Sequence, residues 1–173
     1  MMPLLPLLAL LAPSPIAPMA ESPGGRLHVE RSFTITLNAG TEVATRAFGA
    51  VAEERWAPGF SPLFAYPNPP KDVEGAVFTL QVPRTQIWLL QTWDMVDHVV
   101  RYVAVDPGIK ISVIVIRVTP FGTNQSRATV TYDRTSLSTA GDAEVAEFAK
   151  TFVNQASEWE NAINAYLAKT GAP

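Results

Sequence analysis

Few side chains in this sequence have the chemistry of a catalyst or a metal ligand. The 173-residue chain contains no cysteine and only two histidines, His28 and His98. The lack of cysteine excludes a disulfide framework, a thiolate zinc site, an iron–sulfur site and a cysteine nucleophile. Two histidines also leave little for a histidine-based metal site. We therefore expect no metal and no cofactor, and we assign no catalytic residue.

Common catalytic sequence motifs are missing as well. The sequence has no phosphate-binding G-x-x-x-x-G-K-[ST], no G-x-G-x-x-G, no H-E-x-x-H and no G-x-S-x-G. A Ser–His–Asp triad stays open, because triads are defined by geometry, although both histidines are more simply explained as surface or strand-end residues. The carboxylate pair Glu53–Glu54 is more simply explained as the solvated end of a helix.

Two tyrosines and two arginines lie on strand faces that could point into a cavity. In such a cavity, Tyr102 and Tyr132 would place their hydroxyl groups among apolar side chains, where each hydroxyl needs a hydrogen-bond partner from the protein or from a ligand. Arg117 and Arg134 could hold an acidic group of a ligand at the mouth of the cavity. Ordinary core packing of the tyrosines and ordinary ion pairs of the arginines remain the alternatives.

Tryptophans complete the candidate set. Trp88 could line the cavity, and Trp56 anchors a segment rich in prolines and aromatics, residues 56–70, which we expect to be a loop that could cover it. Aromatic walls with a few convergent polar groups suit a pocket for an apolar small molecule, and they equally suit a filled core. The predicted ligand-binding residues are Trp56, Trp88, Tyr102, Arg117, Tyr132 and Arg134.

A sheet and helices must position these side chains, and the hydrophobic periodicity predicts both. Residues 28–37 alternate apolar and polar, which indicates a half-buried strand, and a short helix is expected over 42–54. Apolar residues at helical spacing predict one long amphipathic helix over 142–169, capped by Asp142. Five β-rich segments with connections too short for parallel crossovers lie between the helices, at 76–82, 85–93, 98–105, 111–119 and 126–137.

The beginning of the chain differs from the rest. Residues 1–20 hold no charged residue, and the apolar run within them is too short to cross a bilayer. This segment fits either a secretory signal peptide cleaved after Ala20 or a leader upstream of a true start at Met19. We assign residues 1–25 to a leader and 26–170 to one domain. If translation starts at Met19, we expect a cytoplasmic protein. If the leader is a signal peptide, we expect a secreted or periplasmic protein.

The order of these elements resembles the SRPBCC or START-like superfamily, which includes proteins of the polyketide cyclase/dehydratase type. The resemblance covers roughly residues 28–168. It is carried by the order and spacing of Phe33–Ile35, Trp56–Phe60, Gly75–Phe78, Arg101–Val103, Thr129–Tyr132 and Trp159–Leu167. It implies an α+β helix-grip fold, in which a curved antiparallel sheet of about six strands wraps around a long C-terminal helix. It also implies a hydrophobic cavity between that sheet and that helix.

The charge balance is modest, with 13 basic against 16 acidic residues and a net charge of −3. No basic face or like-charge run indicates a nucleic-acid partner, and we expect a monomer whose partner is a hydrophobic small molecule. The favoured hypothesis is a binder or carrier of a lipid, polyketide or aromatic compound. The alternatives are a cyclase/dehydratase-type enzyme using a cavity tyrosine, histidine or arginine, and an interaction domain without a cavity.

Overall fold

The computed structural model describes residues 25–170. All but the last residue of the predicted leader lies outside the described residues, so the choice between a signal peptide and a start at Met19 stays a prediction. The strands are β1 (His28–Leu37), β2 (Leu63–Tyr66), β3 (Val77–Gln81), β4 (Thr85–Asp94), β5 (Val99–Asp106), β6 (Lys110–Pro120) and β7 (Ser126–Ser136). The helices are α1 (Thr41–Arg46), α2 (Ala50–Trp56), α3 (Thr139–Thr151) and α4 (Gln155–Thr170), with a 3₁₀ turn at Phe152–Asn154 between the last two.

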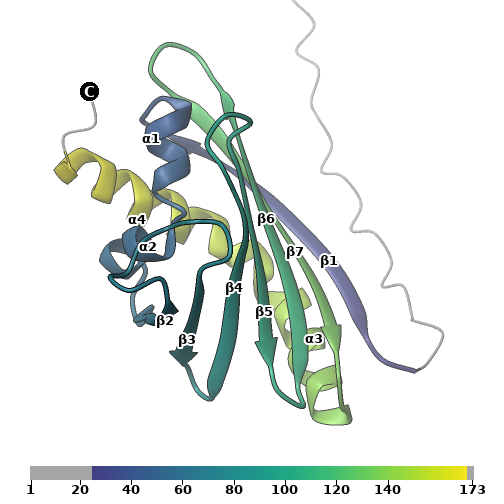
Figure 1. The fold of residues 1–173 in the computed structure, drawn as a ribbon. Coiled ribbons are helices and arrows are strands. Elements are labelled where there is room, and N and C mark those ends of the chain that lie inside the picture. The colour runs from purple at the N-terminus through teal and green to yellow at the C-terminus, as the bar shows by residue number, and fades with distance from the viewer. Residues whose placement is uncertain (1–24, 171–173) are drawn as a thin grey trace, which may run out of the picture.

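Seven antiparallel strands form one curved sheet in the order β1-β7-β6-β5-β4-β3-β2 (Figure 1). Helices α3 and α4 run across one face of this sheet, and α2 contacts α4. This is the predicted α+β helix-grip fold. The sheet has one strand more than expected, because Leu63 and Phe64, within the segment predicted as a loop, pair with Thr79 and Phe78 of β3.

Alternation along each strand decides which side chains face the helices. In β1, Val29, Ile35 and Leu37 are buried, whereas Glu30 and Ser32 point away and are exposed. This confirms the half-buried strand predicted from the period of two, since successive side chains of a strand point to opposite faces.

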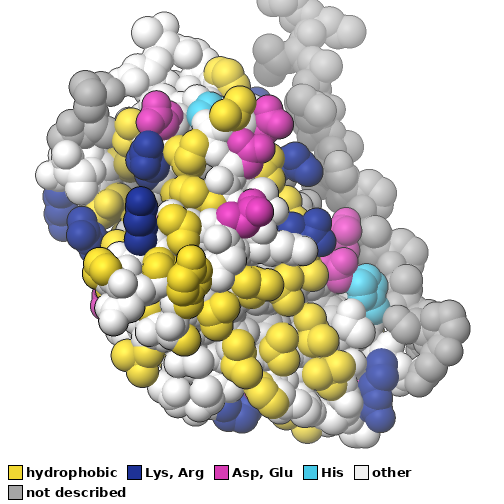
Figure 2. Space-filling model, viewed as in Figure 1, with side chains coloured by type: hydrophobic (Ala, Val, Ile, Leu, Met, Phe, Trp, Pro, Cys, Tyr) yellow, Lys and Arg dark blue, Asp and Glu magenta, His cyan; other side chains and the backbone are white. Residues whose placement is uncertain are grey.

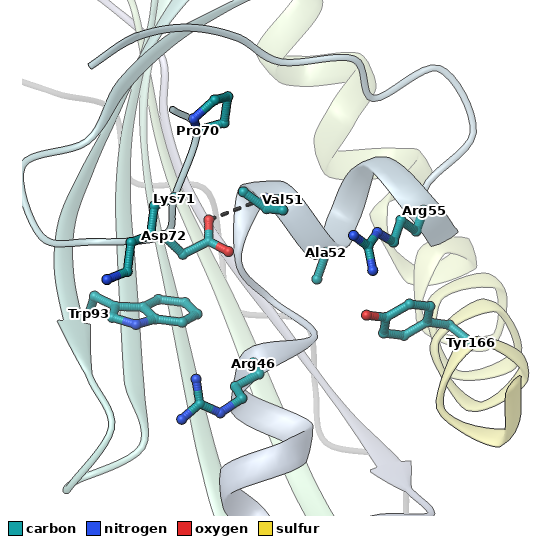
Figure 3. A pocket seen from close by; sticks show the side chains of 9 residues that line it. All are labelled: Arg46, Val51, Ala52, Arg55, Pro70, Lys71, Asp72, Trp93 and Tyr166. Carbon is teal, nitrogen blue, oxygen red and sulfur yellow. Dashed lines mark hydrogen bonds between the residues drawn. The ribbon is translucent and has the colours of Figure 1, made fainter. Parts of the chain in front are cut away.

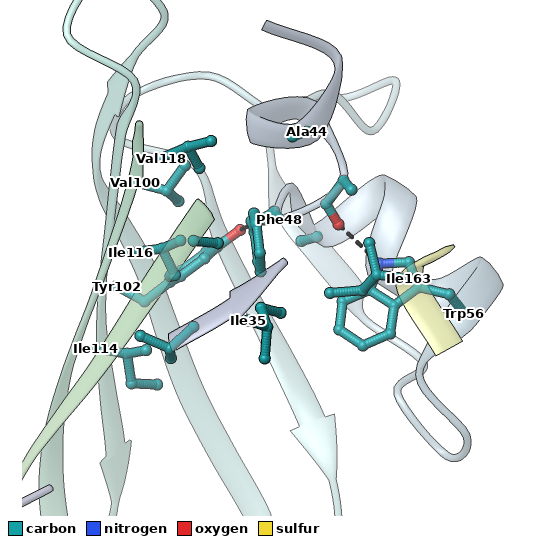
Figure 4. Packing of buried hydrophobic residues seen from close by; sticks show 14 of the residues in the cluster. Ile35, Ala44, Phe48, Trp56, Val100, Tyr102, Ile114, Ile116, Val118 and Ile163 are labelled. Carbon is teal, nitrogen blue, oxygen red and sulfur yellow. Dashed lines mark hydrogen bonds between the residues drawn. The ribbon is translucent and has the colours of Figure 1, made fainter. Parts of the chain in front are cut away.

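The hydrophobic core fills the space between the sheet and the helices, and further hydrophobic side chains lie on the surface among charged ones (Figure 2). Figure 4 shows part of this core, including Phe48 from the segment between α1 and α2, Ile116 of β6 and Ile163 of α4. Phe48 and Ile163 have no exposed surface. Among residues 25–170, no helix combines the length and the apolar character needed to span a membrane.

The short helix predicted over 42–54 is two helices. The chain leaves the helical conformation at Gly49, which is extended with φ −79° and ψ 147°, and α2 begins at the next residue. The carboxylate of Asp72, from a distant loop, accepts a hydrogen bond from Val51 N at 3.2 Å and fills the space beside Gly49 where a Cβ would lie. The break therefore depends on a long-range contact.

The long helix predicted over 142–169 also differs in two respects. It starts at Thr139, with Ser138 as the N-cap whose hydroxyl accepts a hydrogen bond from Gly141 N at 3.1 Å. The predicted cap, Asp142, lies in the first turn and accepts a hydrogen bond from Leu27 N at 3.0 Å, which ties the start of β1 to α3. The 3₁₀ turn then interrupts the helix and separates α3 from α4.

Candidate functional site

The strand register places the two predicted tyrosines in one row across the sheet. Tyr102 of β5 pairs with Ile114 of β6, and Ile114 pairs with Tyr132 of β7. All three side chains are buried, so the row faces the helices. Alternation on three adjacent strands therefore brings together residues that lie far apart in the sequence.

A cavity of about 110 Å³ lies between this row and the helices. Trp159 closes it from α4, and Glu53 and Trp56 close it from α2. Four of the six predicted site residues line it: Trp56, Trp88, Tyr102 and Tyr132. The complete lining is Glu53, Trp56, Ala57, Phe60, Trp88, Tyr102, Ile114, Ile116, Tyr132 and Trp159.

The aromatic walls of the cavity hold one another in place. The rings of Trp88 and Tyr102 meet edge to face, with centroids 5.8 Å apart, and those of Trp56 and Trp159 do so at 5.4 Å. Trp56 is fixed further because its indole N–H donates a hydrogen bond to the carbonyl of Ala47 at 2.7 Å. Edge-to-face pairs of this kind add stability beyond that from the area they bury.

The two tyrosine hydroxyls of the row differ in their partners. Tyr102 donates a hydrogen bond to the carbonyl oxygen of Phe48 at 3.0 Å. Among the described residues, the Tyr132 hydroxyl has no hydrogen-bond partner. Burial raises the pKa of both phenols, so both are neutral O–H groups near neutral pH. Tyr102 is therefore satisfied within the protein, and Tyr132 keeps its hydroxyl available to a ligand.

Glu53 is the functional candidate that the sequence interpretation placed wrongly. Its side chain is only 8% exposed and lines the cavity, whereas Glu54 is exposed. No hydrogen bond to its carboxyl group is present within residues 25–170. Burial raises the pKa of this carboxyl well above its ordinary value of 4.5, and the nearby charge of Asp72 raises it further. Such surroundings favour the protonated, neutral form of the carboxyl group.

A helical signal for this burial is present in the sequence. The buried residues of α2 are Ala50, Glu53 and Trp56, which are spaced three apart and share one face of the helix. Trp56 was expected to anchor the segment, so a helix extended to Trp56 would have placed Glu53 on its buried side.

The predicted arginines lie in two different places. Arg134 sits next to the cavity, with its guanidinium carbon 3.5 Å from the centre of the Phe148 ring, and its Nε has no hydrogen-bond partner in the described part of the chain. It lines a separate hollow of about 30 Å³, which has room for one or two water molecules. Burial lowers the pKa of Arg134. Arg117, by contrast, is exposed on the opposite face of the sheet and lies outside the cavity.

Neither histidine lines the cavity. His28, at the start of β1, shares a hydrogen bond with the Thr135 hydroxyl at 2.9 Å and lies 3.4 Å from an oxygen of Asp133. His98 lies in the turn before β5, in the left-handed region with φ 53°, so it is not part of the strand predicted to start there. The described residues contain no group of three or more histidine, aspartate or glutamate side chains able to hold a metal ion.

A larger hollow of about 320 Å³ lies on the other side of α2 (Figure 3). Trp93 and Tyr166 face each other across it, and Arg46 and Arg55 reach into it from the two short helices. Asp72 borders it while accepting the hydrogen bond from Val51. None of the predicted site residues line this hollow.

An ion-pair network outside the cavity fixes α3 to the sheet. The carboxylate of Asp106, 2% exposed, lies 2.9 Å from Arg84 and 3.0 Å from Lys110. Glu144 of α3 lies 2.8 Å from each of the same two basic groups. The network joins β5 and β6 to the first turns of α3 and has no part in the cavity's lining.

Comparison with known proteins agrees with this architecture. No family model and no curated protein matches the sequence. Among solved structures, norcoclaurine synthase from Thalictrum flavum is similar with a TM-score of 0.61 and 10% identity, covering 83% of this chain and 88% of that one. A START superfamily protein from Mycobacterium smegmatis has a TM-score of 0.59 and 12% identity, covering 79% of this chain and 97% of that one.

The Zhui aromatase/cyclase from Streptomyces sp. R1128 has a TM-score of 0.57 and 14% identity, covering 80% of this chain and 92% of that one. Similarity at such low identity concerns the fold. The chain therefore shares the helix-grip fold of these proteins, which confirms the predicted fold.

Proposed function

We propose that this protein binds a small, largely apolar molecule in the cavity between the sheet and the C-terminal helix. The observation that carries the proposal is the cavity itself, about 110 Å³ in volume and walled by tryptophan, tyrosine, phenylalanine and isoleucine side chains. An engineered apolar cavity of about 150 Å³ is large enough to bind benzene. The volume therefore suits a ligand of about one ring, and a larger ligand would have to displace part of the wall.

The structural neighbours support this scale of ligand. A structure of norcoclaurine synthase from Thalictrum flavum contains dopamine and hydroxybenzaldehyde, both single-ring compounds, and has a TM-score of 0.62 with this chain. That protein and the aromatase/cyclase indicate that this fold accommodates ring-containing molecules. We further propose that the chain acts as a monomer and without a nucleic-acid partner.

Two measurements test the proposal. Native mass spectrometry of the purified full chain should detect a bound small molecule. After that molecule is extracted, the emptied protein should bind added benzene. In NMR spectra, benzene should shift the indole N–H signals of Trp56, Trp88 and Trp159, which line the cavity, and leave that of Trp93, which lines the other hollow, unchanged.

A cavity-filling variant supplies the matched comparison. Ala57→Leu adds side-chain volume at the cavity wall and should abolish the benzene-induced shifts, while Ala140→Leu, at an exposed position of α3, should retain them. A protein that binds neither benzene nor any co-purified compound would overturn the proposal and favour an interaction domain.

The second candidate function is an enzyme, and Glu53 is the specific observation that favours it. A buried carboxyl group with a raised pKa can donate a proton to a substrate near neutral pH, as a general acid does. Strongly perturbed carboxyl groups in cavities occur preferentially at functional sites. Acid-assisted dehydration or cyclisation of a ring compound is the reaction type that this group would serve.

A further inference from the structure

Two polar groups that line the cavity have no partner within the described protein. The carboxyl group of Glu53 and the hydroxyl group of Tyr132 both border the cavity, and neither forms a hydrogen bond with residues 25–170. Since both side chains border the cavity, a ligand bound there could supply the hydrogen bonds that the protein does not. Tyr102 serves as the contrast, because its hydroxyl is already bound to the backbone of Phe48.

The small size of the cavity brings these two groups within reach of one ligand. At about 110 Å³, the space has no room for two ring-sized molecules, so whatever fills it touches both walls. Glu53 enters from α2, while Tyr132 enters from β7 on the opposite side.

The lining of the cavity favours an uncharged ligand. It contains no lysine or arginine, and the charge of Asp72, which acts on Glu53, is negative. The guanidinium of Arg134 lies over the rings of Phe148 and Tyr132 and borders the separate hollow. An anion in the cavity would thus lose its hydration without direct contact with a cation, which is unfavourable.

We propose that Glu53 and Tyr132 donate two hydrogen bonds to a single carbonyl oxygen, so that the cavity selects small, uncharged cyclic carbonyl compounds. This inference rests on the proposed function, because it requires that the cavity binds a ligand. A carbonyl oxygen has two lone pairs and accepts two such bonds. A neutral carboxylic acid and a phenol in an apolar site would also polarise the carbonyl group and stabilise negative charge that develops on its oxygen.

The test compares two ligands of the same shape. Cyclopentanone carries the carbonyl group, and methylenecyclopentane replaces its oxygen with a CH₂ group. Tyr132→Phe and Glu53→Leu each remove one donor while keeping an apolar side chain at the cavity wall. Each variant should weaken the binding of cyclopentanone about tenfold, the equivalent of one hydrogen bond, and should leave the binding of methylenecyclopentane unchanged or tighter. Glu54→Leu, at an exposed position, is the control.

A spectroscopic signature separates hydrogen bonding from a general loss of packing. In the infrared spectrum, the carbonyl stretch of cyclopentanone bound to the wild-type protein should lie at lower frequency than in an apolar solvent. Part of this shift should disappear in each variant. If both ligands bind and respond equally to the substitutions, the carbonyl proposal is overturned while the proposed function stands. If neither ligand binds to a wild-type protein that does bind benzene, the carbonyl proposal is overturned and the proposed function stands; if benzene and co-purified compounds also fail to bind, both are overturned.

Discussion

The burial of Glu53 predicts an unusual dependence of stability on pH. Because the pKa of its carboxyl is raised in the folded protein, the folded state keeps a proton that the unfolded state loses above the ordinary value of 4.5. The free energy of unfolding therefore falls as pH rises, by about 1.4 kcal/mol per pH unit, until the folded-state pKa is reached. This loss of stability grows with every pH unit over which Glu53 stays protonated in the folded protein.

The substitution Glu53→Gln removes this titration and tests the reasoning. Urea denaturation between about pH 5 and about pH 8 should show a stability that falls with pH in the wild type and falls much less in the variant. The free energies of unfolding of the two proteins can also differ by the same amount at every pH, because the amide of the variant has no hydrogen-bond partner. The test therefore compares only how steeply the free energy of unfolding changes with pH. The adjacent, exposed Glu54→Gln should keep the wild-type slope.

Other carboxyl groups contribute little to that difference. Asp72 titrates in the same direction, since burial raises its pKa too, but it is present in both proteins and its contribution cancels in the comparison. Asp94, whose pKa is lowered by backbone hydrogen bonds from Asp97 and Val96, titrates below the measured range. Parallel curves for the wild type and Glu53→Gln would refute the conclusion that this carboxyl is neutral when the protein is folded.

Further predictions concern the stability of the scaffold. Tyr102→Phe removes the buried hydrogen bond to Phe48 and should lower the free energy of unfolding by about 1–2 kcal/mol, whereas Tyr132→Phe should change it by less than about 0.5 kcal/mol. If urea denaturation showed the same loss of stability in both variants, the conclusion that only the Tyr102 hydroxyl has a hydrogen-bond partner would be contradicted. Gly141→Ala would place a methyl group against the carbonyl oxygen of Ile109 and should cost about 1–3 kcal/mol, and a thermal melt unchanged from the wild type would show that no such close approach exists.

The strands and their pairing could be predicted because turn residues separate runs of clear alternation. Gly108 illustrates this: it lies between β5 and β6 with φ 73°, a conformation that favours glycine, and the predicted ends of both strands are within one residue of the structure. The row that contains Tyr102 and Tyr132 follows from the same alternation. Four of the six predicted site residues therefore line one cavity.

The side of the sheet on which an arginine lies could not be predicted, because β6 is apolar on both faces. Val113 and Val115 are partly buried on the outer face with Arg117, while Ile114 and Ile116 are buried on the inner one. Composition gives no preference between two such faces. Glu53 was placed wrongly for a different reason: the predicted helix ended at residue 54, and only its extension to Trp56 shows that Glu53 lies on the buried face.

The 3₁₀ turn at Phe152–Asn154 has a mechanical consequence for the cavity. On one side of it, α3 is fastened to the sheet by Glu144 through its ion pairs. On the other side, α4 is fastened to β1, where the Glu160 carboxylate accepts a hydrogen bond from Thr36 N at 2.8 Å and the Asn164 side chain bonds to Thr36 O at 3.0 Å. The 3₁₀ turn thus divides the attachment of the long helix between two places, so that α4, whose Trp159 lines the cavity, is held to the sheet independently of the ion pairs of α3.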